Sequence, residues 1–141
     1  MIRGIFLFVL IITVFACSQP SGQLWKESQL MAPANLAKML NDTLNKKPLL
    51  YSIGFSGGIK GSVELGPAAE KENLEKFKSE ISNLDRNAEI IIYCGCCPFE
   101  NCPNIRPAFS LLNELKFTNH KLLNLSENLK VDWIDKGYPV K

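Results

Sequence analysis

Apolar and polar positions recur along this chain with two different periods. Compact apolar runs bounded by glycine, proline or asparagine predict buried strands at 49–53, 62–65, 89–93 and 122–125. Apolar residues three or four apart predict a helix that begins at Pro33, two more at 69–84 and 108–116, and a short one after 131. Residues 25–31 are expected to be only a lead-in to the first helix.

Strands that alternate with helices favour a parallel sheet with helices on both of its faces. The chain has 141 residues, which is enough for one domain with a substantial core. No internal repeat is visible, and we see no further domain boundary beyond the amino-terminal segment. We therefore expect one α/β domain over residues 28–141, with a small, mostly parallel sheet between two helical layers.

The amino-terminal segment has its own pattern. Arg3 precedes an almost wholly apolar run at 5–14, which is typical of a secretory signal and short for a membrane span. The residues Val14-Phe15-Ala16-Cys17 resemble the lipobox of bacterial lipoproteins. That resemblance implies removal of a signal peptide at 1–16 and attachment of lipid to Cys17.

Residues 17–27 are polar and would serve as a tether between the lipid and the domain. We expect an exported domain, lipid-anchored in the bacterial cell envelope and facing the periplasm or the cell surface. A simple signal peptide cut near Ala16 and an uncleaved anchor are the alternatives. In each case the domain would meet an oxidising environment.

Composition and charge narrow the range of partners. The chain has 46% hydrophobic and 21% charged residues, as in an ordinary globular protein. Its 16 basic and 14 acidic residues leave a net charge of +2, and the basic residues are scattered. We expect no nucleic-acid partner, no cofactor, and a monomer.

Four of the five cysteines lie in one loop, as Cys94, Cys96, Cys97 and Cys102. The loop follows the apolar run that ends at Tyr93 and leads into the next predicted helix. Ligands of open α/β sheets bind outside the carboxyl ends of the strands, and a helix amino terminus favours an anion such as a thiolate. The pattern predicts that Cys94 is a reactive thiolate that small donors can reach.

Neighbouring residues would stabilise that anion. The backbone amides of Gly95, Cys96 and Cys97 are expected to face it, and Asn104 is the expected cap of the following helix. Arg106 carries a charge that does not titrate and could hold an oxyanion donor. A surface ion pair is an equally favoured role for this arginine.

Three groups of residues occur in a recognisable order: Ile59-Lys60-Gly61-Ser62, then Ile91-Ile92-Tyr93-Cys94, then Trp133 with Gly137-Tyr138-Pro139-Val140. Together they make the chain from Ser28 to Val140 resemble a single rhodanese-like domain. The resemblance implies a sulfurtransferase. Cys94 would take sulfane sulfur from a donor such as thiosulfate, hold it as a persulfide, and pass it to a thiol or another thiophilic acceptor such as cyanide.

The chain also departs from that family pattern. Ser52 and Gly54 stand where the family has an Asp and an Arg, and Gly58 stands where it has a His. The family's usual bracing of the loop is therefore absent at these three positions.

The other loop cysteines leave three alternatives open. Cys96 or Cys97 could pair with Cys102 in a disulfide, or one of them could resolve an oxidised Cys94. All four could instead hold zinc, copper(I) or an iron–sulfur cluster, although two separated Cys-x-x-Cys pairs are lacking. Inert loop thiols are the third alternative. The corresponding alternatives for function are a thiol–disulfide redox protein, or a binding module that uses the loop from Cys94 to Cys102 to hold a metal or a partner.

Three further residues have expected structural roles. His120 is the single histidine and falls in the predicted turn before the last strand, where we expect it to be exposed. Trp133 and Tyr138 are expected to be packing residues rather than ligand contacts.

Overall fold

The computed structural model describes residues 22–141, so the predicted signal peptide and Cys17 lie outside the described residues. Five strands form one sheet in the order β1-β5-β4-β2-β3, and every neighbouring pair is parallel. The strands are β1 (Leu30–Met31), β2 (Leu49–Ser52), β3 (Val63–Glu64), β4 (Ile90–Tyr93) and β5 (His120–Leu123). The expected α/β fold with a parallel sheet is confirmed.

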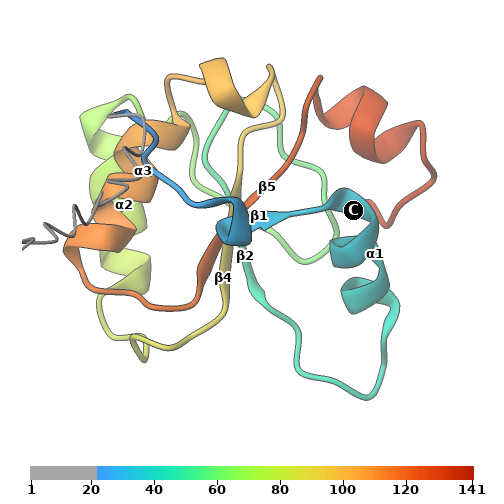
Figure 1. The fold of residues 1–141 in the computed structure, drawn as a ribbon, viewed down its shortest axis with the longest axis horizontal. Helices are drawn as coiled ribbons and strands as arrows, with labels where there is room; N and C mark the ends of the chain where they lie inside the picture. The colour runs from blue at the N-terminus through green and yellow to red at the C-terminus, as the bar shows by residue number, and fades with distance from the viewer. Residues whose placement is uncertain (1–21) are drawn as a thin grey trace, which may run out of the picture.

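Helices cover both faces of this sheet. They are α1 (Pro33–Asn41), α2 (Lys71–Ile81), α3 (Ile105–Glu114), and the short turns η1 (Glu27–Gln29), η2 (Phe99–Asn101) and η3 (Lys130–Ile134). Figure 1 shows α2 and α3 together on one side of the sheet and α1 on the other. The molecule therefore has three layers, with the sheet in the middle.

β4 is the central strand, and its four residues are all buried. Successive side chains of a strand point to opposite faces. Ile90 and Ile92 accordingly pack into the core beneath α2 and α3, whereas Ile91 and Tyr93 pack into the core on the α1 side. This two-sided burial explains why the strand is a continuous apolar run instead of an alternating one.

The helix α1 and the strands β2 and β4 lie where the sequence predicts them, but the lead-in is more ordered than expected. Leu30 and Met31 pair with Leu122 and Leu123 as an edge strand too short to show a period of two. Trp25 is buried and packs against two phenylalanine rings. The packed domain therefore includes part of the segment predicted to be a tether.

The expectation for His120 is wrong, because β5 begins two residues earlier than predicted and includes it. His120 is buried, and its ring lies 4.6 Å from that of Phe109. Its Nε2 lies 3.2 Å from the side-chain amide nitrogen of Gln29, so this ring atom accepts and Nδ1 donates to the Phe117 carbonyl at 3.1 Å. Both ring nitrogens are thus used, and the histidine is a structural residue of the core.

A hydrogen-bond network joins the turn before β3 to the end of β4. Ser62 donates to the carbonyl of Ile59 at 2.9 Å, and its oxygen lies 3.0 Å from the hydroxyl of Tyr93. That hydroxyl also accepts the backbone N–H of Ile59 at 3.4 Å. The network fixes Tyr93, and therefore the point at which the chain leaves the sheet before Cys94.

The end of the chain packs against the same turn. Trp133 is fully buried, and its indole N–H donates to the carbonyl of Pro139 at 2.9 Å. Val140 forms a bridge with Ile59, and the ring of Tyr138 lies 5.2 Å from that of Trp133. The expected packing role of Trp133 is confirmed, and Tyr138 packs beside it.

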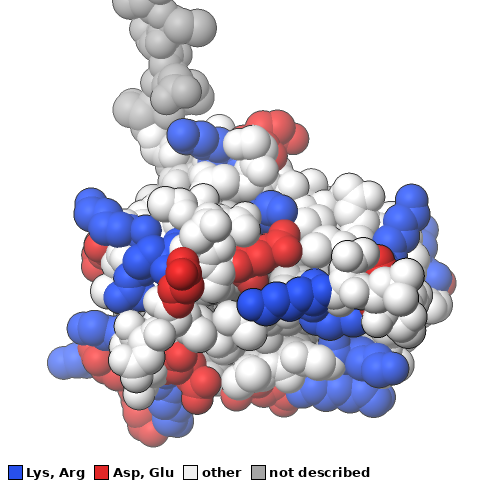
Figure 2. Space-filling model, turned by 90° about the horizontal axis from the view of Figure 1, so that it is seen from below, with Lys and Arg blue, Asp and Glu red and all other residues white. Residues whose placement is uncertain are grey.

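The surface carries charges of both signs. Figure 2 shows basic and acidic side chains interspersed over the face seen there, rather than gathered into one patch. Over residues 22–141, no helix has both the length and the apolar character that a membrane crossing requires.

Candidate functional site

The cysteine loop lies at the carboxyl end of the sheet, beside the junction of β2 and β4. From this junction the chain runs outward in opposite directions, from β2 to β3 and from β4 through α3 to β5. Such a divergence is where open α/β sheets bind ligands. β2 leads into Gly54 and β4 leads into Cys94, so these two residues meet at that point.

The loop brings four thiols into one cluster, formed by Cys94, Cys96, Cys97 and Cys102. Their sulfur atoms all lie within 4.8 Å of one another. The sulfur of Cys96 is 3.3 Å from that of Cys94 and 3.5 Å from that of Cys97. All four are free thiols. We refer to this group as the thiol cluster.

Cys94 does not face solvent, and this corrects the expectation that small donors reach it directly. Its side chain is 1% exposed and belongs to the core beneath α2 and α3. The reason is the period of the strand, because residue 94 continues the alternation that points Ile90 and Ile92 into that core. Cys102 is equally buried, whereas Cys96 is exposed and Cys97 is half-buried.

The direction of the Cys94 pKa is also opposite to the expected one. A hydrogen bond to Cys102, followed by burial, raises the pKa of the Cys94 thiol well above its usual value. The same hydrogen bond lowers the pKa of Cys102. Burial raises the pKa of Cys97 to about 11, and it also raises the pKa of Cys96. The hydrogen bond between Cys94 and Cys102 therefore favours negative charge on Cys102 over negative charge on Cys94.

N–H groups nevertheless point at the buried sulfurs. The side-chain amide of Asn104 donates to the sulfur of Cys94 at 3.6 Å. The backbone N–H of Cys96 acts to lower the pKa of Cys94, and the backbone N–H of Asn104 acts to lower the pKa of Cys102. The Asn104 side chain thus supplies a hydrogen-bond donor that a sulfur anion needs, and the anion-binding role of the Gly95, Cys96 and Cys97 amides stays a prediction.

Asn104 occupies the N-cap position of α3, but its side chain does not cap the helix. Its Oδ1 instead accepts the backbone N–H of Ala69 at 3.0 Å, which leaves its Nδ2 directed at Cys94. The capping interpretation of Asn104 is therefore wrong. Ala69 lies in the segment before α2, and no sequence pattern indicates that a distant backbone group orients this amide.

Gly95 and Arg106 differ from their expected surroundings. The carbonyl of Gly95 accepts the N–H of Leu129 at 2.9 Å, and a Cβ at Gly95 would press on Leu129 and Ser56. The guanidinium of Arg106 lies 5.7 Å from the ring of Trp25 and donates to the Gly22 carbonyl at 3.5 Å. Arg106 is directed to the amino-terminal segment in this structure, and its anion-binding role stays a prediction.

A hollow of about 510 Å³ opens at the surface beside the thiol cluster. Among the described cysteines, only Cys96 lines it. Its apolar rim includes Phe55, which is 76% exposed, and Ile134, which is 49% exposed. Lys130 also lines it. A small molecule that approaches the cluster from this hollow meets Cys96 before Cys94.

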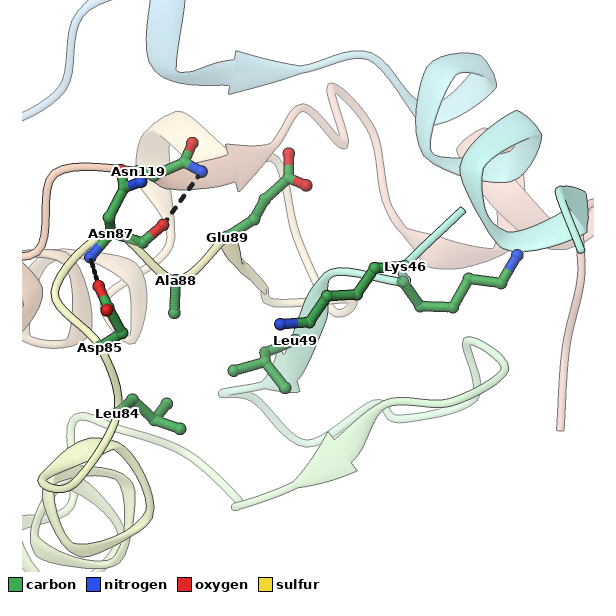
Figure 3. A pocket seen from close by; sticks show the side chains of 9 residues that line it. Lys46, Leu49, Leu84, Asp85, Asn87, Ala88, Glu89 and Asn119 are labelled. Carbon is green, nitrogen blue, oxygen red and sulfur yellow. Dashed lines mark hydrogen bonds between the residues drawn. The ribbon is translucent and has the colours of Figure 1, made fainter. Parts of the chain in front are cut away.

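A second hollow of about 440 Å³ lies at the opposite end of the sheet, before β2, β4 and β5. Figure 3 shows Lys46, Leu49, Leu84 and Glu89 around it, with Asn87 hydrogen-bonded to Asn119. No cysteine, and no histidine, lines it. Among the described residues, the cysteines are therefore gathered at the thiol cluster, away from this second hollow.

Comparison with models of known protein families gave no match, and comparison with curated proteins gave none either. The function of this chain must therefore be inferred from its own residues.

Proposed function

We propose that this chain is an exported sulfurtransferase that accepts sulfane sulfur at the thiol cluster and holds it as a persulfide on Cys94. Its donor is of the thiosulfate type, and its acceptor is a thiol or another thiophile such as cyanide. The observation that carries the proposal is the N–H donor from Asn104 on a cysteine at the carboxyl end of the central strand. The same donor would stabilise the Cys94 thiolate that takes up the sulfur.

The likeness to a rhodanese-like domain supports this chemistry. The residues on which it rests contact one another, since Ser62 bonds to Tyr93 and Trp133 bonds to Pro139. The contacts of Tyr93 fix the start of the cysteine loop, and they support the proposal because they determine where Cys94 lies.

Because Cys94 is buried, the sulfur enters through Cys96. The thiolate of Cys96 attacks the outer sulfur of thiosulfate, the S–S bond of the donor breaks, and sulfite leaves with the bonding electron pair. Cys94 first gives its proton to the Cys102 thiolate, whose pKa the hydrogen bond between the two residues lowers. The resulting Cys94 thiolate, 3.3 Å from the sulfur of Cys96, then attacks the terminal sulfur of the Cys96 persulfide and releases the Cys96 thiolate. An acceptor thiolate later removes the same sulfur from Cys94, which restores the starting enzyme.

The test uses the full chain, purified in detergent and reduced. After incubation with thiosulfate, we expect a mass gain of about 32 Da, one sulfur atom, on the peptide that contains Cys94. Addition of cyanide should release thiocyanate and remove the gain. Without thiosulfate, neither product should form.

Two variants separate the steps. Cys96→Ser should slow sulfur uptake at Cys94, and Cys94→Ser should leave the added sulfur on Cys96. Cys17→Ser is the matched control, because it removes the one cysteine outside the loop. A wild-type chain that gains no sulfur from thiosulfate or from a low-molecular-weight persulfide contradicts the proposal.

A thiol–disulfide oxidoreductase is the second candidate, and the 3.3 Å separation of the Cys94 and Cys96 sulfurs favours it. In that case a mild disulfide oxidant would remove two hydrogens, about 2 Da, from the loop peptide and become reduced itself. The change would reverse with dithiothreitol at a definite potential. The absence of any sulfur gain in the same preparation would select this candidate.

A further inference from the structure

We infer that the thiol cluster is also a binding site for a single zinc ion, held by Cys94, Cys96, Cys97 and Cys102. This inference does not depend on sulfur transfer. It follows from the positions of the four sulfur atoms, which all lie within 4.8 Å of one another although they come from one loop.

These positions fit one tetrahedral ion. Zinc–sulfur bonds of about 2.3 Å in a tetrahedron place each pair of sulfurs about 3.8 Å apart. The separations of 3.3 Å from Cys94 to Cys96 and 3.5 Å from Cys96 to Cys97 lie just below that value, and no separation exceeds 4.8 Å. The widest pair of sulfurs is therefore at most about 1 Å farther apart than in a zinc tetrahedron.

A four-iron cluster does not fit the same positions. Each cysteine of such a cluster binds a different iron at a corner of a cube, so its sulfurs lie farther apart than those of a mononuclear site. Copper(I) favours fewer sulfur ligands than the four that converge here. The number and spacing of the thiols therefore select a tetrahedral divalent ion, and thiolate ligands select zinc over magnesium or calcium.

The surroundings are those of a metal–thiolate site. Cys94 and Cys102 are buried and would close the inner side, whereas Cys96 and Cys97 reach the surface and would close the outer side. Four thiolates around Zn²⁺ leave a charge of −2, which must be stabilised by hydrogen-bond donors. The Asn104 side chain supplies such a donor to the Cys94 sulfur.

Zinc binding and sulfur uptake exclude each other in one molecule, because both use the sulfurs of Cys94 and Cys96. A zinc-loaded chain should therefore take up no sulfur from thiosulfate until a chelator removes the ion. A cell-envelope protein with this property would respond to the supply of zinc.

The experiment uses the full chain in detergent, reduced, stripped of metal and kept without oxygen. We expect one Co²⁺ per chain to give the intense visible absorption of a tetrahedral tetrathiolate complex, and one Zn²⁺ to displace it. Competition with a chromogenic chelator then gives the zinc affinity. No sulfur donor is present, so this result is independent of the sulfur-transfer assay.

Two ligand variants and one control decide the outcome. Cys102→Ser and the exposed Cys96→Ser should each lower zinc affinity by at least about 100-fold, whereas Cys17→Ser should leave it unchanged. Circular dichroism of the metal-free chains shows whether each variant folds. Because Cys96 is exposed, Cys96→Ser keeps the test valid even if Cys102→Ser does not fold. Equal affinity in Cys96→Ser and wild type, or a cobalt complex without tetrahedral bands, overturns the inference.

Discussion

Gly54 and Cys94 share one space at the carboxyl end of β2 and β4: a Cβ atom at Gly54 would overlap the Cys94 sulfur. Position 54 therefore needs a glycine because the Cys94 sulfur lies beside it, and not because a turn needs the backbone freedom of glycine. The sulfur occupies the volume that any other residue at position 54 would fill.

Gly54→Ala should destabilise the fold by about 1–3 kcal/mol, because the sulfur and the new methyl group cannot both fit. In a Cys94→Ala background the space is free, so the same change should cost much less. Urea unfolding of the four chains of this double-mutant cycle measures the coupling. Additive effects would contradict the shared space.

Asn104→Asp should lower zinc affinity by about 10- to 100-fold and slow sulfur uptake, because it replaces an N–H donor to the Cys94 sulfur by an acceptor. Asn101→Asp is the matched control. Asn101 is an exposed residue of the same loop, so it adds the same charge away from the thiols. Equal losses in the two variants would show that charge alone is responsible.

The four loop thiols should react with iodoacetamide in the order of their exposure. Cys96 should be modified first and Cys97 second, whereas Cys94 and Cys102, each 1% exposed, should react only slowly in the folded chain. Timed quenching followed by peptide mass spectrometry gives the order, and urea-unfolded protein is the reference in which all four react alike. Rapid modification of Cys94 in the folded chain would contradict its burial.

Tyr93→Phe should lower the free energy of unfolding by about 1–3 kcal/mol, because it removes the hydroxyl that bonds Ser62 and Ile59 inside the core. Tyr51→Phe makes the same chemical change on the neighbouring strand. The Tyr51 hydroxyl has no hydrogen-bond partner among residues 22–141, so its loss should cost less than about 0.5 kcal/mol. Denaturant unfolding of both variants checks the difference.

The stability of the protein should fall as the pH drops below about 6.5, the ordinary pKa of histidine. Burial lowers the pKa of His120, so the unfolded chain binds a proton that the folded chain excludes. Stability therefore rises with pH through the window between the folded and unfolded pKa values, by up to about 1.4 kcal/mol per pH unit.

Unfolding in urea at several pH values, compared between wild type and His120→Gln, measures this contribution. The free energy of unfolding of the variant should depend less steeply on pH than that of wild type, from about pH 6.5 down to the pH at which the carboxylates begin to titrate. Parallel curves for the two chains would show that His120 does not titrate between the folded and unfolded states.

The regular elements of the fold were predictable. The apolar residues in β2 and β4, and those three or four apart along α2, are the residues that the core buries. The two-residue strand β1 was not predictable, since Leu30 and Met31 gain their structure only from pairing with Leu122 and Leu123. His120 was misplaced for a related reason. Its side chain packs against Phe109 of the preceding helix and bonds to Gln29, which lies 91 residues away in the sequence.

The residues of the candidate site were predictable, but their environments were not. The spacing of the cysteines indicates one loop, yet it cannot show that Cys94 continues the inward side of β4 and lies beneath Cys96. The orientation of Asn104 is set by the backbone of Ala69, 35 residues away. Contacts of this kind depend on the assembled sheet and leave no local pattern.

The two tryptophans, Trp25 and Trp133, belong to different layers of the core, on opposite sides of the sheet. The chain contains no others. Replacement of either one by phenylalanine would leave a single tryptophan, whose fluorescence, excited selectively near the red edge of its absorption, reports on one layer alone. The molecule thus carries an intrinsic probe for each half of its core, and a comparison of their melting curves would show whether the half that supports the cysteines can loosen while the other remains intact.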